Sequence, residues 1–188
     1  MAGRATNPSD EGKVGQFRDL ALPHLDQVYT LARYLMGNAS EAEDAAQECY
    51  LRAFRHFDSY RGPAMKPWLF AILRNVCRYA HAKNFGLVFT DVPVEPDDGV
   101  APVWSSDSET PEHIMLRRHD TETMRRLIAD LPADYREVIV LREINDLSYR
   151  DIAAIIDSPV GTVMSRLSRA RAMLRNAWIA AEGEEIRT

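Results

Sequence analysis

Apolar side chains recur at helical spacing along two long stretches of the chain. From residue 17 to residue 84 they return every three or four positions, and the same spacing resumes near Ile114 and continues to about Ala181. Side chains separated by three or four positions share one face of an α-helix. Neither stretch shows the strict alternation of apolar and polar residues that is typical of a strand. The pattern therefore predicts an all-α protein.

Residues 85–113 interrupt this pattern. They contain four prolines and Gly99 among several serines and aspartates, a composition that opposes a long helix. A structureless segment of this length is uncommon inside a compact domain, so we interpret it as a linker. We expect two small helical domains, residues 16–84 and 114–181, joined by a flexible acidic linker at 85–113, with a disordered N-terminus at 1–15 and a tail at 182–188.

Charge changes this picture, because its distribution is uneven. The formal net charge of −5 disfavours a nucleic-acid binder. However, residues 61–83 carry five cationic side chains and residues 158–181 carry four, and neither segment contains an acidic residue. The linker between them carries seven acidic side chains and no lysine or arginine. Because local potential governs association with a polyanion, the two basic segments predict contact with nucleic acid.

Residues 147–174 have the pattern of a helix-turn-helix. A short helix, Tyr149–Ile156, is followed by the break Asp157-Ser158-Pro159, and a second helix begins near Val160. At about 100° per residue, one face of the second helix is apolar, with Val163, Leu167, Ala170 and Leu174. The opposite face is small and cationic, with Ser165, Ser168, Arg169 and Ala172. Small side chains permit close approach and arginine can donate two hydrogen bonds to guanine, so this face predicts binding in the major groove of DNA.

The same segment resembles a known family. LPADYREVIVLREINDLSYRDIAAIIDSPVGTVMSRLSRARAML, residues 131–174, is similar to region 4 of the extracytoplasmic-function (ECF) sigma factors. AEDAAQECYLRAFRHFDSYRG, residues 42–62, resembles sigma regions 2.1–2.2, and PWLFAILRNVCRYAHAK, residues 67–83, resembles regions 2.3–2.4. The resemblance implies a non-catalytic subunit that directs RNA polymerase to particular promoters.

The resemblance also implies roles for individual residues. Contacts with the clamp helices of the polymerase β′ subunit are expected from Asp44, Gln47 and Glu48. Contacts with the −10 promoter element are expected from Arg61, Lys66, Asn75, Arg78 and Tyr79. Contacts with the −35 element are expected from Arg142, Thr162, Ser165, Arg166 and Arg169. The implied partners are core RNA polymerase, including its β flap, promoter DNA, and an anti-sigma factor.

Two positions depart from the family pattern. Met164 stands where lysine or arginine is common, so one phosphate contact is expected to be absent. Pro67 stands where primary sigma factors have the first of two aromatic residues that open DNA, which implies limited melting power.

Other classes of function remain open at this point. A free-standing helix-turn-helix regulator would explain residues 147–174 but not residues 42–83, and a sigma mimic that sequesters an anti-sigma factor would not need a cationic recognition helix. An enzyme is disfavoured, because the five histidines show no metal-binding spacing and no nucleophile or phosphate-binding motif is present. We expect no metal and no cofactor.

The remaining expectations concern location and thiol chemistry. Cys49 and Cys77 are far apart in the sequence and are interpreted as buried apolar residues. No apolar run approaches the length of a membrane span and the N-terminus lacks a signal-peptide core, so we expect a cytoplasmic protein with no membrane insertion.

Overall fold

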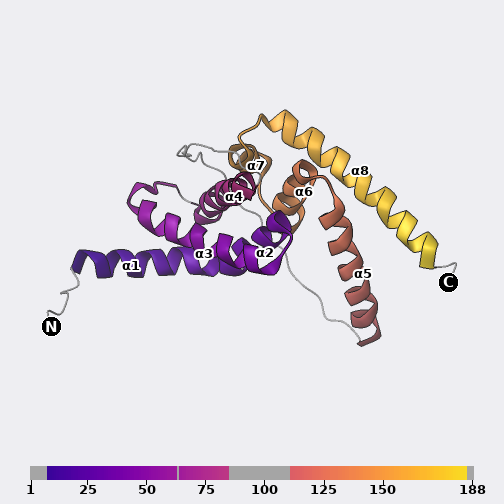
Figure 1. Cartoon of the computed structure of the whole chain (residues 1–188), viewed down its shortest axis with the longest axis horizontal. Helices are drawn as coiled ribbons and strands as arrows, with labels where there is room; N and C mark the ends of the chain where they lie inside the picture. The colour runs from indigo at the N-terminus through magenta and orange to yellow at the C-terminus, as the bar shows by residue number, and fades with distance from the viewer. Residues whose placement is uncertain (1–7, 63, 85–110, 186–188) are drawn as a thin grey trace. The chain divides into compact units, whose positions relative to one another are not determined.

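The computed structural model describes residues 8–62, 64–84 and 111–185, and in these ranges every regular element is a helix. The chain divides into two compact units, Met1–Asp98 and Gly99–Thr188, which we name unit 1 and unit 2. Their helices are labelled in Figure 1. The all-α fold class predicted from the sequence is confirmed.

Unit 1 is a bundle built mainly from three helices. Its elements are α1 (Pro8–Ala21), the 3₁₀ turn η1 (Leu22–His24), α2 (Leu25–Met36), α3 (Ala39–His56), the 3₁₀ turn η2 (Phe57–Ser59) and α4 (Met65–Asn84). Helices α2, α3 and α4 pack against one another. The side chains that they bury are apolar and include Val28, Leu31, Ala42, Cys49, Ala53, Leu69, Phe70 and Leu73. Burial of each large apolar side chain contributes about 1.5–3 kcal/mol to folding.

Local signals set the sharp turn between α2 and α3. Gly37 ends α2 in the left-handed conformation, with φ of 81°, which glycine adopts without the steric penalty of a Cβ atom. Asn38 then caps α3, because its side-chain oxygen accepts a hydrogen bond of 2.9 Å from the backbone N–H of Glu41. This turn allows α2 and α3 to pack side by side.

The start of helix α1 contradicts the prediction for the N-terminal segment. Residues 1–15 were expected to be disordered because they are polar and contain Gly and Pro, but the chain is helical from Pro8 onward. The helix is held by Phe17, whose ring lies 5.3 Å from the rings of both Phe54 and Phe57 in edge-to-face geometry. The Tyr50 hydroxyl also donates a hydrogen bond of 3.0 Å to the carbonyl of Ala21. Contacts with distant parts of the sequence, rather than local composition, therefore order this segment.

Unit 2 is a second helical cluster. It comprises α5 (Pro111–Asp130), α6 (Ala133–Ile139), the π-helical turn η3 (Val140–Ile144), α7 (Tyr149–Ile156) and the long α8 (Val160–Glu185). Helix α8 is the yellow-orange helix in Figure 1 and packs against α5, α6 and α7. The core is formed by Val138, Ile139, Leu141, Leu147, Ile152, Ile156, Val163, Leu167 and Ala170.

Two helices of unit 2 extend slightly beyond the helical segment predicted at residues 114–181. Helix α5 begins at Pro111 and not at residue 114, because proline suits the first turn of a helix, where no N–H is required. Helix α8 continues through the predicted tail to Glu185, since nothing in its sequence before that point breaks a helix outright. The central part of the predicted linker, residues 85–110, lies outside the described residues.

Candidate nucleic-acid and protein interfaces

The helix-turn-helix is built by local capping signals. Ser148 and Asp151 form a capping box at the start of α7, with the Ser148 hydroxyl accepting a hydrogen bond of 3.1 Å from the Asp151 N–H. Asp157 ends α7 in the left-handed conformation, with φ of 50°. Helix α8 begins at Val160, so the turn is short. The predicted bounds of the short helix, Tyr149–Ile156, are confirmed.

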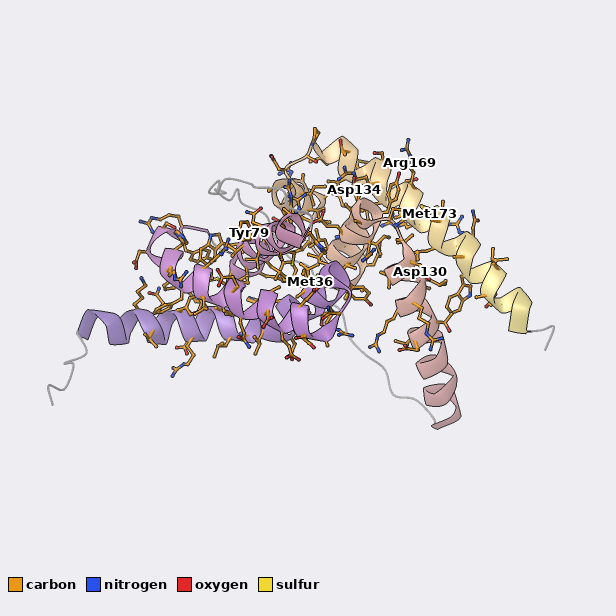
Figure 2. All side chains as sticks on the ribbon, in the orientation of Figure 1. Met36, Tyr79, Asp130, Asp134, Arg169 and Met173 are labelled. Carbon is orange, nitrogen blue, oxygen red and sulfur yellow. The ribbon has the colours of Figure 1, made fainter. Side chains whose placement is uncertain are left out.

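The two faces of α8 differ in burial as their sequence predicts. Val163 and Leu167 are buried against α6 and α7, whereas Ser165, Ser168 and Arg169 are exposed. Figure 2 shows Arg169 on the outer side of the helix. Within the described part of the chain, Arg169 has no ion pair or hydrogen-bond partner. This side chain is therefore available to an external acceptor.

The two neighbouring arginines of α8 are held within unit 2. Arg166 is about three-quarters buried and donates a hydrogen bond of 2.9 Å to the carboxylate of Asp134 on α6. Arg171 donates two hydrogen bonds, of 3.0 and 2.6 Å, to one carboxylate oxygen of Glu143 in η3. Hydrogen bonds to Glu143 and then to Tyr149 raise the pKa of Arg171. These pairs fix α8 against α6 and η3.

Arg142 is also engaged inside unit 2. It lies in the π-helical turn η3, donates a hydrogen bond of 2.7 Å to the carbonyl of Leu147, and places its guanidinium carbon 5.2 Å from the ring centroid of Tyr149. The turn is supported by buried Asn145, whose side chain donates to the carbonyl of Val140 at 3.0 Å. Single π-helical turns occur often at functional sites. Arg142 is thus positioned at the entry to the helix-turn-helix by backbone geometry.

Helix α3 presents a second candidate interface. Asp44 and Gln47 are exposed, and Glu48 is partly exposed beside them. Leu51 lies on the same face at helical spacing and is 52% exposed. Sequence reasoning missed Leu51, although its position seven residues after Asp44 was the available signal. A polar and acidic face with one exposed apolar residue is suited to docking on another protein.

The residues predicted for the −10 element lie along α4 and in the segment before it. Arg78 and Tyr79 are exposed, and Asn75 is half-buried on the same face of α4. Lys66 lies at the start of α4, about 13 Å along the helix from Asn75. Arg61 precedes α4 and donates to the backbone carbonyls of Asp58 and Tyr60. Nine residues are about two and a half helical turns, so Lys66 projects from the side of α4 opposite Asn75, and the five side chains do not converge on one pocket.

Arg52 connects the α3 and α4 surfaces and was not identified from the sequence. Its Nε donates a hydrogen bond of 2.7 Å to Glu48, and its guanidinium carbon lies 5.9 Å from the ring centroid of Tyr79. Cation–π contacts of this kind contribute about 0.5–1 kcal/mol at exposed sites. The contact could not be read from the sequence, because it joins residues on two helices.

Both cysteines are buried in unit 1, as predicted. The Cys49 thiol donates to the carbonyl of Leu69 at 3.3 Å, and burial raises the pKa of Cys49 far above its ordinary value. Since the thiolate is the reactive form, burial disfavours reaction at Cys49.

Over the described ranges, no three His, Cys, Asp or Glu side chains are grouped so that they could hold a metal ion. None of the helices in the same ranges is both long enough and apolar enough to cross a membrane.

Two family models match the chain. Sigma-70 region 2 matches residues 20–84, and Sigma-70 region 4 matches residues 121–174. The first range contains the candidate surfaces of α3 and α4, and the second contains the helix-turn-helix.

Curated relatives match the chain over most of its length. The ECF RNA polymerase sigma factor SigW of Bacillus subtilis (strain 168) is 33% identical over 169 residues, which are 88% of this chain and 90% of that protein. The RNA polymerase sigma-H factor of Pseudomonas aeruginosa is 35% identical, covering 84% of this chain and 83% of the relative. The ECF RNA polymerase sigma-E factor of Escherichia coli (strain K12) is 37% identical, covering 73% and 74%.

Solved structures share the fold. The sigma factor RpoE of Bartonella quintana, in complex with the anti-sigma factor NepR, matches with a TM-score of 0.61 and 29% identity over 87% of this chain and 96% of that one. CnrH, in complex with the cytosolic domain of CnrY, has a TM-score of 0.58 at 23% identity, covering 87% and 88%. With family models over both units and relatives at 33–37% identity, the chain belongs to the ECF sigma factors of the sigma-70 family.

Proposed function

We propose that this protein binds core RNA polymerase through unit 1 and recognises promoters through both units. The observation that carries the proposal is that one chain holds an exposed acidic and amide face on α3, a cationic and aromatic surface along α4, and in unit 2 a recognition helix whose residues 160–181 include no acid. Sigma factors are transcription initiation factors rather than catalysts, so the chain itself carries out no reaction. It acts in the bacterial cytoplasm, where the polymerase and the chromosome are.

Unit 1 provides the polymerase contact. Asp44, Gln47 and Glu48, with Leu51 beside them, dock on the clamp helices of the β′ subunit. Exposed carboxylates complement a basic coiled coil and accelerate encounter. The apolar Leu51 side chain, at 52% exposure, adds area that is removed from water on docking.

The promoter contacts are divided between the units. Asn75, Arg78 and Tyr79, with Arg61 and Lys66, bind the single-stranded −10 element, since an exposed aromatic ring can stack on a base and cations can hold phosphates. In unit 2, Arg169 and Ser165 contact bases of the −35 element. Arg142, Thr162 and Arg166 position the helix and contact the DNA backbone, which suits three partly buried side chains, of which both arginines are hydrogen-bonded within unit 2.

Genome-wide run-off transcription with purified core polymerase tests this function. We expect that adding the protein produces new transcripts, whose start sites share two upstream elements. Binding to core polymerase without any new transcript would instead favour a sigma mimic. Failure to bind core polymerase, together with binding to duplex DNA, would favour a free-standing regulator.

The polymerase contact has its own test. Replacing Gln47 and Glu48 together with alanine should weaken binding to core polymerase at least about tenfold, because both side chains lie on the docking face. The matched control replaces Gln16 and Asp26, an exposed amide and an exposed acid elsewhere in unit 1. The affinity for core polymerase, measured by fluorescence anisotropy, should fall in the Gln47 and Glu48 variant only. Equal affinities in both variants would remove the assignment.

Control by an anti-sigma factor is a further part of the proposal. It is supported by the similar Bartonella quintana protein, which was solved in complex with the anti-sigma factor NepR. Co-purification from the native host, with identification of the bound protein by mass spectrometry, tests it. We expect a partner that blocks polymerase binding, and a partner that leaves this binding intact would contradict the proposal.

A further inference from the structure

An exposed apolar facet lies at the start of α8. Met164 is 54% exposed and Val160 is 38% exposed, and a separation of four residues places them side by side on the helix. Val163, between them in sequence, is fully buried in the core. The facet therefore does not belong to the packing of unit 2, although its residues are apolar.

The neighbours of this facet indicate what it contacts. Ser165 and Arg169 are exposed on the adjoining face of the same helix, and no acidic residue occurs between Ser158 and Ala181. The first turns of a recognition helix contact base edges in the major groove. The apolar group in that groove is the 5-methyl group of thymine, whereas the other edges present hydrogen-bond donors and acceptors.

We propose that Met164 contacts the 5-methyl group of a thymine, so that this chain prefers a T·A pair at one fixed position of the −35 element. This inference rests on the proposed function and adds a sequence preference to it. The thioether side chain is flexible and polarizable, so it can follow the methyl group closely. A lysine or arginine at this position would reach a phosphate instead, and would carry no such preference.

The test removes only the methyl group. Each thymine of the −35 element, on either strand, is replaced in turn by uracil in duplex promoter DNA, and affinity is measured with the holoenzyme. At one position we expect uracil to weaken binding by wild type about fourfold, the effect of one buried methyl group. Binding by a Met164→Ser holoenzyme should be unchanged by the same replacement, since the contact is already absent.

Met173→Ser is the matched control. Met173 is 39% exposed on the same helix, about 13 Å further along it, and is labelled in Figure 2. This variant should keep the full response to uracil. Because Met164 and Met173 are both exposed, neither replacement removes a core side chain.

Several results would overturn the inference. One is a −35 element that contains no T·A pair. Another is a wild-type holoenzyme whose affinity is unchanged by uracil at every position. The third is an equal loss of affinity on uracil replacement in the wild-type and Met164→Ser holoenzymes. In each of these cases the holoenzyme still transcribes, so the proposed function stands. Absence of promoter-directed transcription by the wild-type holoenzyme would instead reject the proposed function, and this inference with it.

Discussion

Arg169 and Arg171 lie two residues apart on one helix, and their surroundings give them different roles. Arg169 is exposed and has no partner among the residues that the structure describes, whereas Arg171 is bound to Glu143 by two hydrogen bonds. An unpaired guanidinium can donate two hydrogen bonds to a guanine at little cost, because no internal contact is lost. A paired guanidinium contributes to the geometry of the helix instead.

Replacing Arg169 should therefore affect promoter binding alone. We expect Arg169→Ala to weaken binding to the −35 element by about 1–3 kcal/mol and to relax sequence preference at one position. The free energy of unfolding should change by less than about 0.5 kcal/mol, as is usual for exposed positions. Competition binding with a panel of −35 variants measures the first effect and denaturant titration the second. Unchanged selectivity would contradict the base-reading role.

Replacing Arg171 should instead affect the free energy of unfolding rather than promoter binding. Arg171→Ala removes the ion pair that joins α8 to η3, and should lower the free energy of unfolding by about 0.5–1 kcal/mol, since the pair is half-exposed and screened by solvent. Hydrogen exchange of the full chain should show faster exchange in residues 140–171. The exposed Arg175 provides the control, because Arg175→Ala removes a charge without breaking this pair. An equal effect of both substitutions would show that charge, and not the pair, is responsible.

At the scale of the helix, Phe17 supplies the aromatic contacts that hold α1 to the rest of unit 1. Phe17 is 9% exposed and contacts Tyr50, Phe54 and Phe57. We expect Phe17→Ala to cost about 3 kcal/mol, because it removes a buried aromatic ring and leaves a cavity. Leu20→Ala is the control on the same helix, since Leu20 is 39% exposed. Hydrogen exchange in residues 8–21 should rise strongly in the first variant only, and a similar rise in both would contradict the assignment.

The same helices show which elements the sequence could predict. The bounds of α7 were predicted correctly because a short apolar stripe and an Asp-Ser-Pro break are both local features of the sequence, and the structure adds the Ser148 cap at its start. The first half of α1, residues 8–15, was missed because the order of this helix depends on contacts of Phe17 with rings of α3 and η2 that are distant in the sequence. Arg52 and Leu51 were missed for the related reason that cross-helix contact and exposure are properties of packed helices.

At the scale of the whole molecule, two compact units divide the described helices between them. Each has its own apolar core, with Phe70 and Leu73 buried in unit 1 and Ile152 and Leu167 buried in unit 2. A domain with its own core can unfold by itself. The surfaces that we propose for the −10 and −35 elements thus lie on two units that are stabilised by separate cores.

This independence can be measured in the full chain. The Phe17→Ala substitution in unit 1 should leave the hydrogen-exchange protection of α7 and α8 unchanged, because no part of their core is altered. Unfolding by denaturant should then show two transitions, of which only one shifts relative to wild type. Equal loss of protection in both units would show that the chain unfolds cooperatively as one body.

One ion pair of unit 2 has a consequence for how the protein searches a chromosome. Arg171, which is assigned no contact with DNA, carries Glu143 as an internal counter-charge. Fewer condensed cations are therefore displaced from DNA when the helix approaches an arbitrary sequence, and this displacement supplies nearly all non-specific affinity. We therefore expect short residence at non-matching sites, while the exposed Arg169, which we propose as a base-reading residue, keeps its full attraction for the matching base. Neutralisation of an arginine by a carboxylate of the same unit thus favours rapid release of the protein from DNA sites that do not match the promoter.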